Sequence, residues 1–357
     1  MSGVVEVVEA GLGNCIQDAG RPGYRSIGVP LSGAADRILL ACANRLAGNE
    51  AEQAAIEVNL VGPRLKAVSG IVRIGIAGNV AAHVTGSNGS AADIPAWRTT
   101  TLFPGDVIAI GATRGPAYVS VCGGFRVPRQ LGSRSTYARA RIGGMAGRAL
   151  APGDSLPCGE VRGDPWLEFR AAAPFVHAAG PIRIIPGPQD DYFDPAAFDA
   201  LLGEEFTVSR DADRMGMRLD GPALAHRADK GADIVSDGIV PGAIQVPADG
   251  RAIILLADAQ TVGGYPKIAT VIAADLPRLA HLAPGAGLRF QCVSLADARA
   301  ARLAQEHALA AWCERIASFR PPGVIDEAAL FSENLISGMI DAHAYRCAAD
   351  IDLPWEK

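Results

Sequence analysis

The sequence lacks the features that identify several large classes of protein. Its seven cysteines are scattered with no C-x-x-C pair, which argues against a zinc site or disulfide framework and favours a reducing cytoplasm. The net charge is −5 without any basic run, so we expect neither a nucleic-acid nor a membrane partner. The longest uncharged stretch, Ile74 to Ala92, holds four glycines and several polar residues and does not suit a membrane span. The N-terminus lacks the basic and apolar regions of a signal peptide.

Several nucleotide and hydrolase motifs are also missing. No Gly-Lys-Ser/Thr step occurs, which excludes a P-loop in this chain, and neither H-E-x-x-H, G-x-S-x-G nor G-x-G-x-x-G is found. The six histidines stand far apart in the sequence. A lone histidine is more often a core or surface residue than a ligand, so the sequence predicts no metal site.

What the sequence does contain is a series of short apolar runs bounded by glycine and proline. Three of them follow a Pro-Gly turn, at Pro104, Pro152 and Pro284. This pattern predicts a mostly β (α+β) fold of barrel or sandwich type rather than alternating β-α-β units. The predicted strands include Val4–Val8, Ile71–Ile76, Val107–Ile110, Tyr118–Val121, Ile182–Ile185, Ile253–Leu256 and Leu288–Phe290.

Three helices are expected. One begins at Ser32, as its capping residue, and stops at Gly48; a short one follows Asp194-Pro195; and the last spans residues 295–319. We predict a first β-rich domain over residues 1–165, a second over 166–295, and a C-terminal helix and tail over 296–357. The boundary near residue 165 falls in a charged, proline-bearing stretch.

Two clusters of polar side chains among glycines are candidates for an anion site. The loop of residues 17–25 carries Asp18, Arg21 and Tyr24, and arginine can hold a carboxylate or phosphate bidentately. The alternative is that Asp18 and Arg21 pair only to fix a turn.

The second cluster combines Gly123 and Gly124 with residues 131–136, which include Arg134 and Ser135. Backbone N–H groups, hydroxyls and a guanidinium together suit an oxyanion cradle. A glycine-rich turn with solvated hydroxyls is an equal alternative.

The densest cluster follows the strand Ile253–Leu256. Asp258 comes first and is a candidate general base, or a residue that orients one. Other residues would bind an amide or let a ligand approach the backbone: Gln245, Gln260, Thr261, Gly263, Gly264 and Tyr265. The alternative is a hairpin with an ordinary polar turn. Upstream, Asp213 and Arg214 are expected to belong to a structural ion pair.

At these clusters the sequence resembles the allophanate hydrolase subunit 2 family, also called the KipA or biotin-dependent carboxyltransferase-like family. The resemblance covers about residues 4 to 295, in order. Its motifs are Gln17–Gly23, Gly28-Val29-Pro30 with Ser32-Gly33-Ala34, Leu131–Thr136, Asp213–Gly216, Gly242–Pro247 and Asp258–Pro266. Two positions depart from the family pattern: Ala259, where arginine is frequent, and His281, where glutamine is frequent.

The resemblance implies a cyclophilin-like β-barrel architecture in two parts and a partner chain of the subunit 1 (KipI-like) family, with a LamB/YcsF-like subunit as a further candidate. The activity it favours is that of one subunit of an ATP-dependent 5-oxoprolinase. Two alternatives stay open: the carboxyltransferase half of a urea carboxylase system, with biotin on a separate carrier, and a non-catalytic KipA-like regulator. We expect ATP to be held mainly by a partner, and Asp258, Arg21 and Arg134 to act on a small amide.

Overall fold

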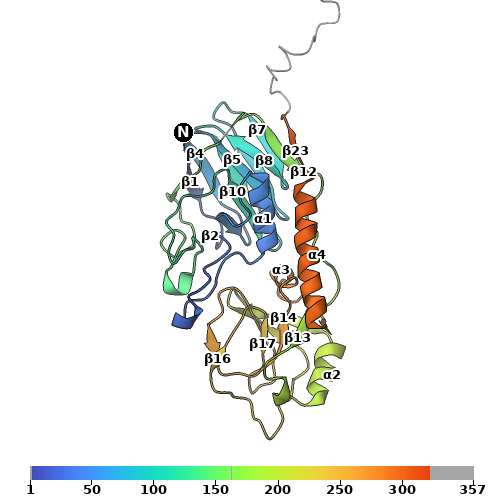
Figure 1. Ribbon diagram of the computed structural model, residues 1–357. Coiled ribbons are helices and arrows are strands. Elements are labelled where there is room, and N and C mark those ends of the chain that lie inside the picture. Colours follow the sequence, from blue (N-terminus) through green and yellow to red (C-terminus); the bar gives the residue numbers. More distant parts are fainter. Residues whose placement is uncertain (1, 162, 322–357) are drawn as a thin grey trace, which may run out of the picture. The chain divides into compact units, whose positions relative to one another are not determined.

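The computed structural model describes residues 2–161 and 163–321, and their strands form two modules (Figure 1). The first module comprises residues 2–161 and 163–171 with 316–319, and the second comprises residues 182–292. The chain divides into two units by its contacts, Met1–Phe319 and Arg320–Lys357, and both modules belong to the first unit. The domain boundaries at residues 165 and 295 stay a prediction. No helix in the described part is long and apolar enough to cross a bilayer.

The first module is a pair of antiparallel sheets packed face to face. One sheet has the order β11 (Ser155–Pro157), β1 (Val4–Glu9), β4 (Arg64–Ser69), β9 (Val107–Ile110), β6 (Ala81–Thr85) and β7 (Ala91–Pro95). The other has the order β2 (Cys15–Gln17), β3 (Ala55–Val58), β10 (Ala117–Val121), β5 (Val72–Ala77), β8 (Arg98–Leu102), β12 (Glu168–Ala171) and β23 (Ile316–Phe319). The core lies between them because alternate residues such as Val5, Val7 and Ile56 face inward.

Helix α1 (Arg37–Leu46) covers the outer face of the second of these sheets. Its buried side is Leu39, Leu40, Ala43 and Leu46. A Cβ at Gly75 of β5 would lie 2.6 Å from the Ala43 carbonyl oxygen, so glycine is what allows the helix to approach this closely. As a result β5 is buried on both faces.

The second module is one sheet that curls back on itself. Its order is β21 (Gly287–Leu288), β14 (Phe206–Ala212), β15 (Gly216–Asp220), β18 (Ile253–Leu255), β17 (Ala243–Gln245), β20 (Lys267–Val271), β13 (Ile182–Pro186) and β22 (Phe290–Cys292). Only Arg289 separates β21 from β22, although these strands form opposite edges. The two edges therefore meet, which makes the sheet barrel-like.

Smaller elements complete the second module. A two-stranded ribbon of β16 (Asp237–Gly238) and β19 (Val262–Gly263) accompanies the barrel, together with α2 (Pro195–Gly203) and α3 (Leu276–Leu279). The chain also forms single-turn helices at Arg25–Ile27, Ala138–Ala140 and Asp190–Tyr192.

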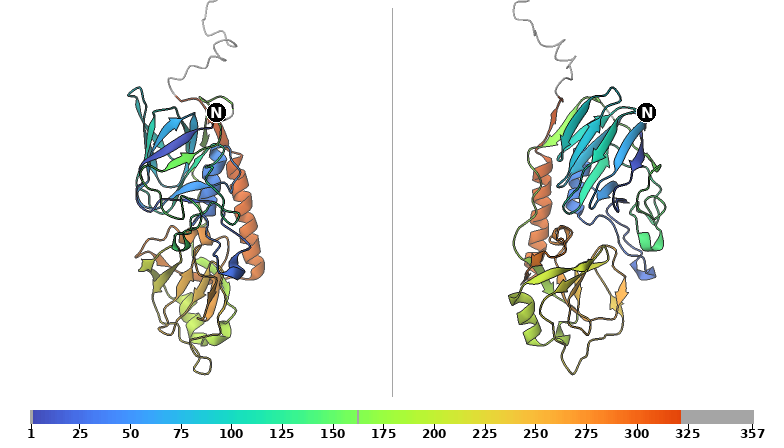
Figure 2. Two further views of the ribbon diagram at one scale, coloured as in Figure 1. Left: turned by 90° about the vertical axis from the view of Figure 1, so that its left-hand side faces the viewer. Right: turned by 180° about the vertical axis from the view of Figure 1, so that it is seen from behind.

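Helix α4 (Leu295–Cys313) leads the chain back from the second module to the first, and all three views show it beside both (Figures 1 and 2). Ser294 and Asp297 form a capping box at its start. Near its end Trp312 is buried and donates from Nε1 to the Ala173 carbonyl at 2.8 Å. Strand β23 then pairs with β12, so the C-terminal end of the described unit completes the first module's sheet.

The predicted mostly β architecture in two parts with a C-terminal helix is confirmed. The three Pro-Gly turns also hold, since Gly105, Gly153 and Gly285 all have positive φ and precede strands. Two helix limits were wrong. The first helix begins after Asp36, because Ser32 and Gly33 have positive φ and Asp36 supplies the cap.

The last helix ends at Cys313 rather than residue 319, because Ile316–Phe319 pairs with β12 instead. The predicted strand Leu288–Phe290 is two strands that break at Arg289.

Candidate functional site

Asp18 fastens the first predicted cluster to the second. It lies just after β2, and its Oδ1 accepts from Ser133 Oγ at 2.6 Å and from Ser135 Oγ at 2.5 Å. Oδ2 accepts from the backbone N–H of Arg134 at 2.6 Å. These charge-assisted bonds occupy both oxygens of a carboxylate that is only 8% exposed. Asp18 therefore positions the loop of residues 133–135, and its role in binding a ligand stays a prediction.

Arg21 is fully buried beside this anchor. One Nη donates to the Ser135 carbonyl, whereas Nε and the other Nη have no hydrogen-bond partner among the described residues. Burial lowers the pKa of Arg21, and the carboxylates of Asp18 and Asp258 oppose that shift. A buried guanidinium with unused donors is costly unless something pairs with it, so Arg21 is a strong candidate to bind an anionic or carbonyl oxygen.

Arg214 joins the two modules through carboxylates on both sides. Its Nη1 donates to Glu57 of β3 at 2.5 Å, and its Nε donates to Asp258 at 2.8 Å. We call Glu57, Arg214 and Asp258 the Arg214 joint. Burial works to lower the pKa of Arg214, but the charges of Glu57 and Asp258 outweigh it and hold that pKa well above its ordinary value. The guanidinium is thus a fixed cation.

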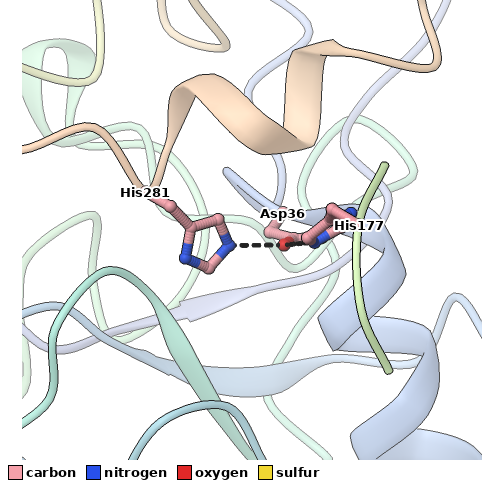
Figure 3. Close-up of side chains that lie close together, drawn as sticks. All are labelled: Asp36, His177 and His281. Atoms are coloured by element: carbon pink, nitrogen blue, oxygen red, sulfur yellow. Dashed lines mark hydrogen bonds and ion pairs between the residues drawn. The ribbon is translucent and has the colours of Figure 1, made fainter. Parts of the chain in front are cut away.

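A second polar contact between the modules lies at the start of α1. Asp36 Oδ2 accepts from Nε2 of His177 at 2.7 Å and from Nε2 of His281 at 2.8 Å, and the two rings flank the carboxylate (Figure 3). We call these residues the His–Asp cluster. Burial works to raise the pKa of Asp36, but the hydrogen bonds from both histidines bring it below its ordinary value.

Tyr118 connects the Arg214 joint to the His–Asp cluster. Its hydroxyl donates to Glu57 Oε2 at 2.7 Å and accepts from the backbone N–H of Asp36 at 2.9 Å. The tyrosine is fully buried, and burial together with Glu57 raises its pKa well above its ordinary value. One continuous network therefore runs from Asp258 to both histidines.

The third predicted cluster reaches this network through Asp258 alone. Gln260 is exposed, and Gln245 is buried with its amide on the Tyr265 carbonyl at 3.3 Å. Thr261 accepts from the Ile239 N–H through its backbone oxygen. Gly263 belongs to the β16–β19 ribbon, the Gly264 carbonyl accepts from Ile234, and Tyr265 is 41% exposed. Apart from Gln245 of β17, these residues form one segment of the second module that continues from Asp258.

The structure does not bring every candidate to the network. The N–H of Gly123 donates to Asn49 beyond the C-terminal end of α1, whereas Asp36 lies at its N-terminal end. A helix of 10 residues separates them by about 15 Å. Gly123 packs against Gly159, and a Cβ on Gly124 would strike Gln53, so both glycines serve a tight turn.

Two further candidates lie at the edge of the first cluster. Tyr24 is half-buried and caps the turn at Arg25–Ile27 with its carbonyl oxygen. The Nε of Arg134 donates to the Val127 carbonyl, and burial lowers the pKa of Arg134, with the nearby charge of Arg129 adding to the effect.

A cavity of about 800 Å³ lies between the modules and touches the Arg214 joint. Arg214 and Ser32 line it, and the Ser32 hydroxyl is buried with no hydrogen-bond partner among the described residues. Most of the wall is apolar, with Met217, Leu256 and Leu276 among its residues. A cavity of this size with a few polar groups suits a small ligand. None of the catalytic and substrate-binding candidates from the sequence lines it.

Comparison with known proteins decides the family. The profile described as "Carboxyltransferase domain, subdomain A and B" matches residues 27–292. This chain belongs to that family. The resemblance indicated by the sequence motifs is thereby confirmed.

Relatives of this carboxyltransferase-family chain fall into two groups. It is 34% identical to a 5-oxoprolinase subunit of Escherichia coli over 309 residues, which cover 85% of this chain and 96% of that protein. It is 30% identical to urea amidolyase of Saccharomyces cerevisiae, but covers only 17% of that protein. The crystal structure of Kluyveromyces lactis urea carboxylase matches with a TM-score of 0.77 at 28% identity, over 88% of this chain and 30% of that one.

Several residues of the network were not predicted from the sequence with the partners they have, and Glu57, Arg214 and His177 show why. Glu57 is a single charge in the apolar run Ala54–Val58, a signal that could have flagged it as a buried partner. Arg214 was expected in an ion pair, and it is in one, but its partners are Glu57 and Asp258 rather than its neighbour. His177 carries no signal in the sequence, because its partners come from distant segments.

Proposed function

We propose that this chain is one subunit of a hydrolase complex, an ATP-dependent 5-oxoprolinase that opens 5-oxo-L-proline to L-glutamate. The observation that carries the proposal is the similarity to the Escherichia coli 5-oxoprolinase subunit along 96% of that protein. A second such subunit, from Haemophilus influenzae, is also 34% identical and covered to 96%. In the urea amidolyases the matching region is only a small part of a longer chain.

The chemistry of amide opening supports Arg21 as the central residue. When ATP activates the amide oxygen and water attacks the carbon, negative charge gathers on oxygen, and preorganised donors in a dry site stabilise it. Arg21 is buried with two nitrogens unused among the described residues. We assign Arg134 a supporting role.

Asp258 fits a positioning role better than that of a free base. Both of its oxygens face Arg214, at 2.8 and 3.4 Å. It adds a negative charge near Arg21 and fixes the segment that carries Gln260 and Thr261. Substrate contacts from that segment are part of the proposal.

Partners complete the activity. With no P-loop in the chain, we propose that ATP is held by a subunit 1 (KipI-like) chain, with a LamB/YcsF-like subunit as a third component. The isolated chain should then show little turnover. The six described cysteines are free thiols, which fits a cytoplasmic complex.

The test is reconstitution with both partner chains and an assay with 5-oxoproline and ATP. Arg21→Lys keeps the charge but loses the planar donor set, and we expect kcat/KM to fall about 100-fold or more. Arg218→Lys is the matched control, because Arg218 pairs with Asp249 at the surface of the second module. Full activity in Arg21→Lys contradicts the assignment of Arg21, and ATP-dependent turnover by the chain alone contradicts the placement of ATP on a partner.

Carboxyl transfer from carboxybiotin to an amide is the second candidate. The family description and the TM-score of 0.77 to a urea carboxylase favour it. The same donors would stabilise the oxyanion of that reaction. An assay of the same complex with carboxybiotin and urea separates the two activities. Tight partner binding without turnover in either assay would support the regulatory alternative.

A further inference from the structure

We propose that the His–Asp cluster is a binding site for a divalent late transition metal such as zinc. Asp36, His177 and His281 each offer one ligand atom, and these atoms all lie within 4.8 Å of one another. Two imidazoles with one carboxylate form a ligand set that suits zinc, iron or cobalt rather than magnesium or calcium, which prefer oxygen. Three protein ligands leave a coordination position for water.

The distances from the carboxylate oxygen to the two imidazole nitrogens are close to what an ion needs. At present Nε2 of His177 and Nε2 of His281 lie 2.7 and 2.8 Å from Oδ2 of Asp36. Metal bonds of about 2.0–2.1 Å require ligand atoms about 3.0–3.4 Å apart. Each ring would therefore withdraw from Oδ2 by a few tenths of an ångström, and the two Nε2 atoms, which lie within 4.8 Å of each other, would come to a similar separation as each gives up its proton to bind the ion.

The carboxylate is already oriented to serve as a ligand. Its Oδ1 accepts from the backbone N–H groups of Ile38 and Leu39 at 2.9 and 3.0 Å, as the cap of α1. This leaves Oδ2 pointing at both rings (Figure 3). Hydrogen bonds that orient a ligand from behind are a regular feature of metal sites.

Few polar contacts hold the two histidine rings in place. The Nδ1 of His177 is buried without a hydrogen-bond partner among the described residues, so only Nε2 fixes that ring through a polar contact. The His281 side chain is 29% exposed, which gives an ion access. Arg37 and Ala280, the chain neighbours of Asp36 and His281, line the 800 Å³ cavity.

The position of the site predicts what the metal does. Asp36 caps α1 in the first module, His281 follows α3 in the second, and His177 lies on the segment between β12 and β13. An ion bound to all three fastens the modules to one another. Binding should therefore raise the thermal stability of the folded chain by mass action.

The experiment uses the full-length chain, stripped with a chelator and titrated with Zn²⁺ by calorimetry and with Co²⁺ by visible absorption. We expect one equivalent to bind and Tm to rise by a few degrees. His281→Gln should weaken binding at least about 10-fold. The matched control is His83→Gln, because His83 also pairs with an aspartate, Asp93, at 2.7 Å, but on the surface and without a third ligand among the described residues.

Two outcomes overturn the proposal: no saturable binding, or equal zinc affinity in His281→Gln and wild type. X-ray absorption of the zinc-loaded wild-type chain gives a readout that needs no variant. Two imidazole nitrogens with oxygen donors support the site, and a shell containing sulfur places the ion on cysteine and contradicts it.

Discussion

The Arg214 joint and the His–Asp cluster join the same two modules. One relies on a permanently charged arginine and the other on histidine. In each, a carboxylate of the first module is completely buried, Glu57 in one and Asp36 in the other. The second module supplies a guanidinium to Glu57 but an imidazole to Asp36. A guanidinium keeps its charge at any pH where the protein is folded, whereas imidazole can gain a proton or bind a metal. The first contact is therefore constant, and the second can respond to conditions.

We expect the largest loss of unfolding free energy from Arg214→Met. It leaves Glu57 and Asp258 without their shared cation, and loss of one member of a buried ion network costs about 3–5 kcal/mol. We expect urea unfolding of the chain to show a loss of that size, with no dependence on zinc.

Arg218→Met is the control, because that arginine pairs with Asp249, which is half exposed, and a surface pair is worth about 1 kcal/mol or less. Equal losses in the two variants would mean that the Arg214 joint is not the main polar contact between the modules.

Local patterns in the sequence explain most of the strands, because short apolar runs and Pro-Gly turns are local signals. The errors arise where a distant segment decides the outcome. Ile316 and Phe319 keep helical spacing with α4, yet pairing with β12 makes them a strand. Ser32 resembles a helix cap, but its N–H bonds to Ala257 in the other module and its backbone leaves the helical region.

The same distinction holds for the site. Asp18, Arg21 and Ser135 were selected as polar residues among glycines, and the structure brings them together. Gly123 was predicted as a site residue for the same reason, but its turn packs against Gly159. The histidines of the His–Asp cluster were set aside because ligand spacing in the sequence detects only sites built on one element.

A change of pH should have an intermediate effect on the free energy of unfolding, through the His–Asp cluster. The folded pKa of Asp36 is below its ordinary value, so its interactions stabilise the protein above about pH 4 and are lost as pH falls through the lower, folded pKa. For a hydrogen-bonded buried charge we expect roughly 1.5–3 kcal/mol. Unfolding free energies from pH 6 to pH 3 should show the first part of this decline in wild type, at most about 1.3 kcal/mol for one carboxylate, and much less of it in Asp36→Asn.

Asp93→Asn is the control for that series, because Asp93 makes the same kind of pair with His83 but is exposed. A decline that persists unchanged in Asp36→Asn would assign the acid sensitivity to other carboxylates.

The smallest effect concerns Tyr118, the residue that links the two contacts. Tyr118→Phe removes the hydroxyl that donates to Glu57 and accepts from the Asp36 N–H, and the expected loss is about 1 kcal/mol. Tyr265→Phe should change nothing, since that hydroxyl bonds to no described residue and the side chain is 41% exposed. The more informative measurement is the double variant with Arg214→Met. If the network acts as a unit, the two losses will not add, because Glu57 has already lost its partner. Strict additivity would mean that the Arg214 joint and the His–Asp cluster act independently.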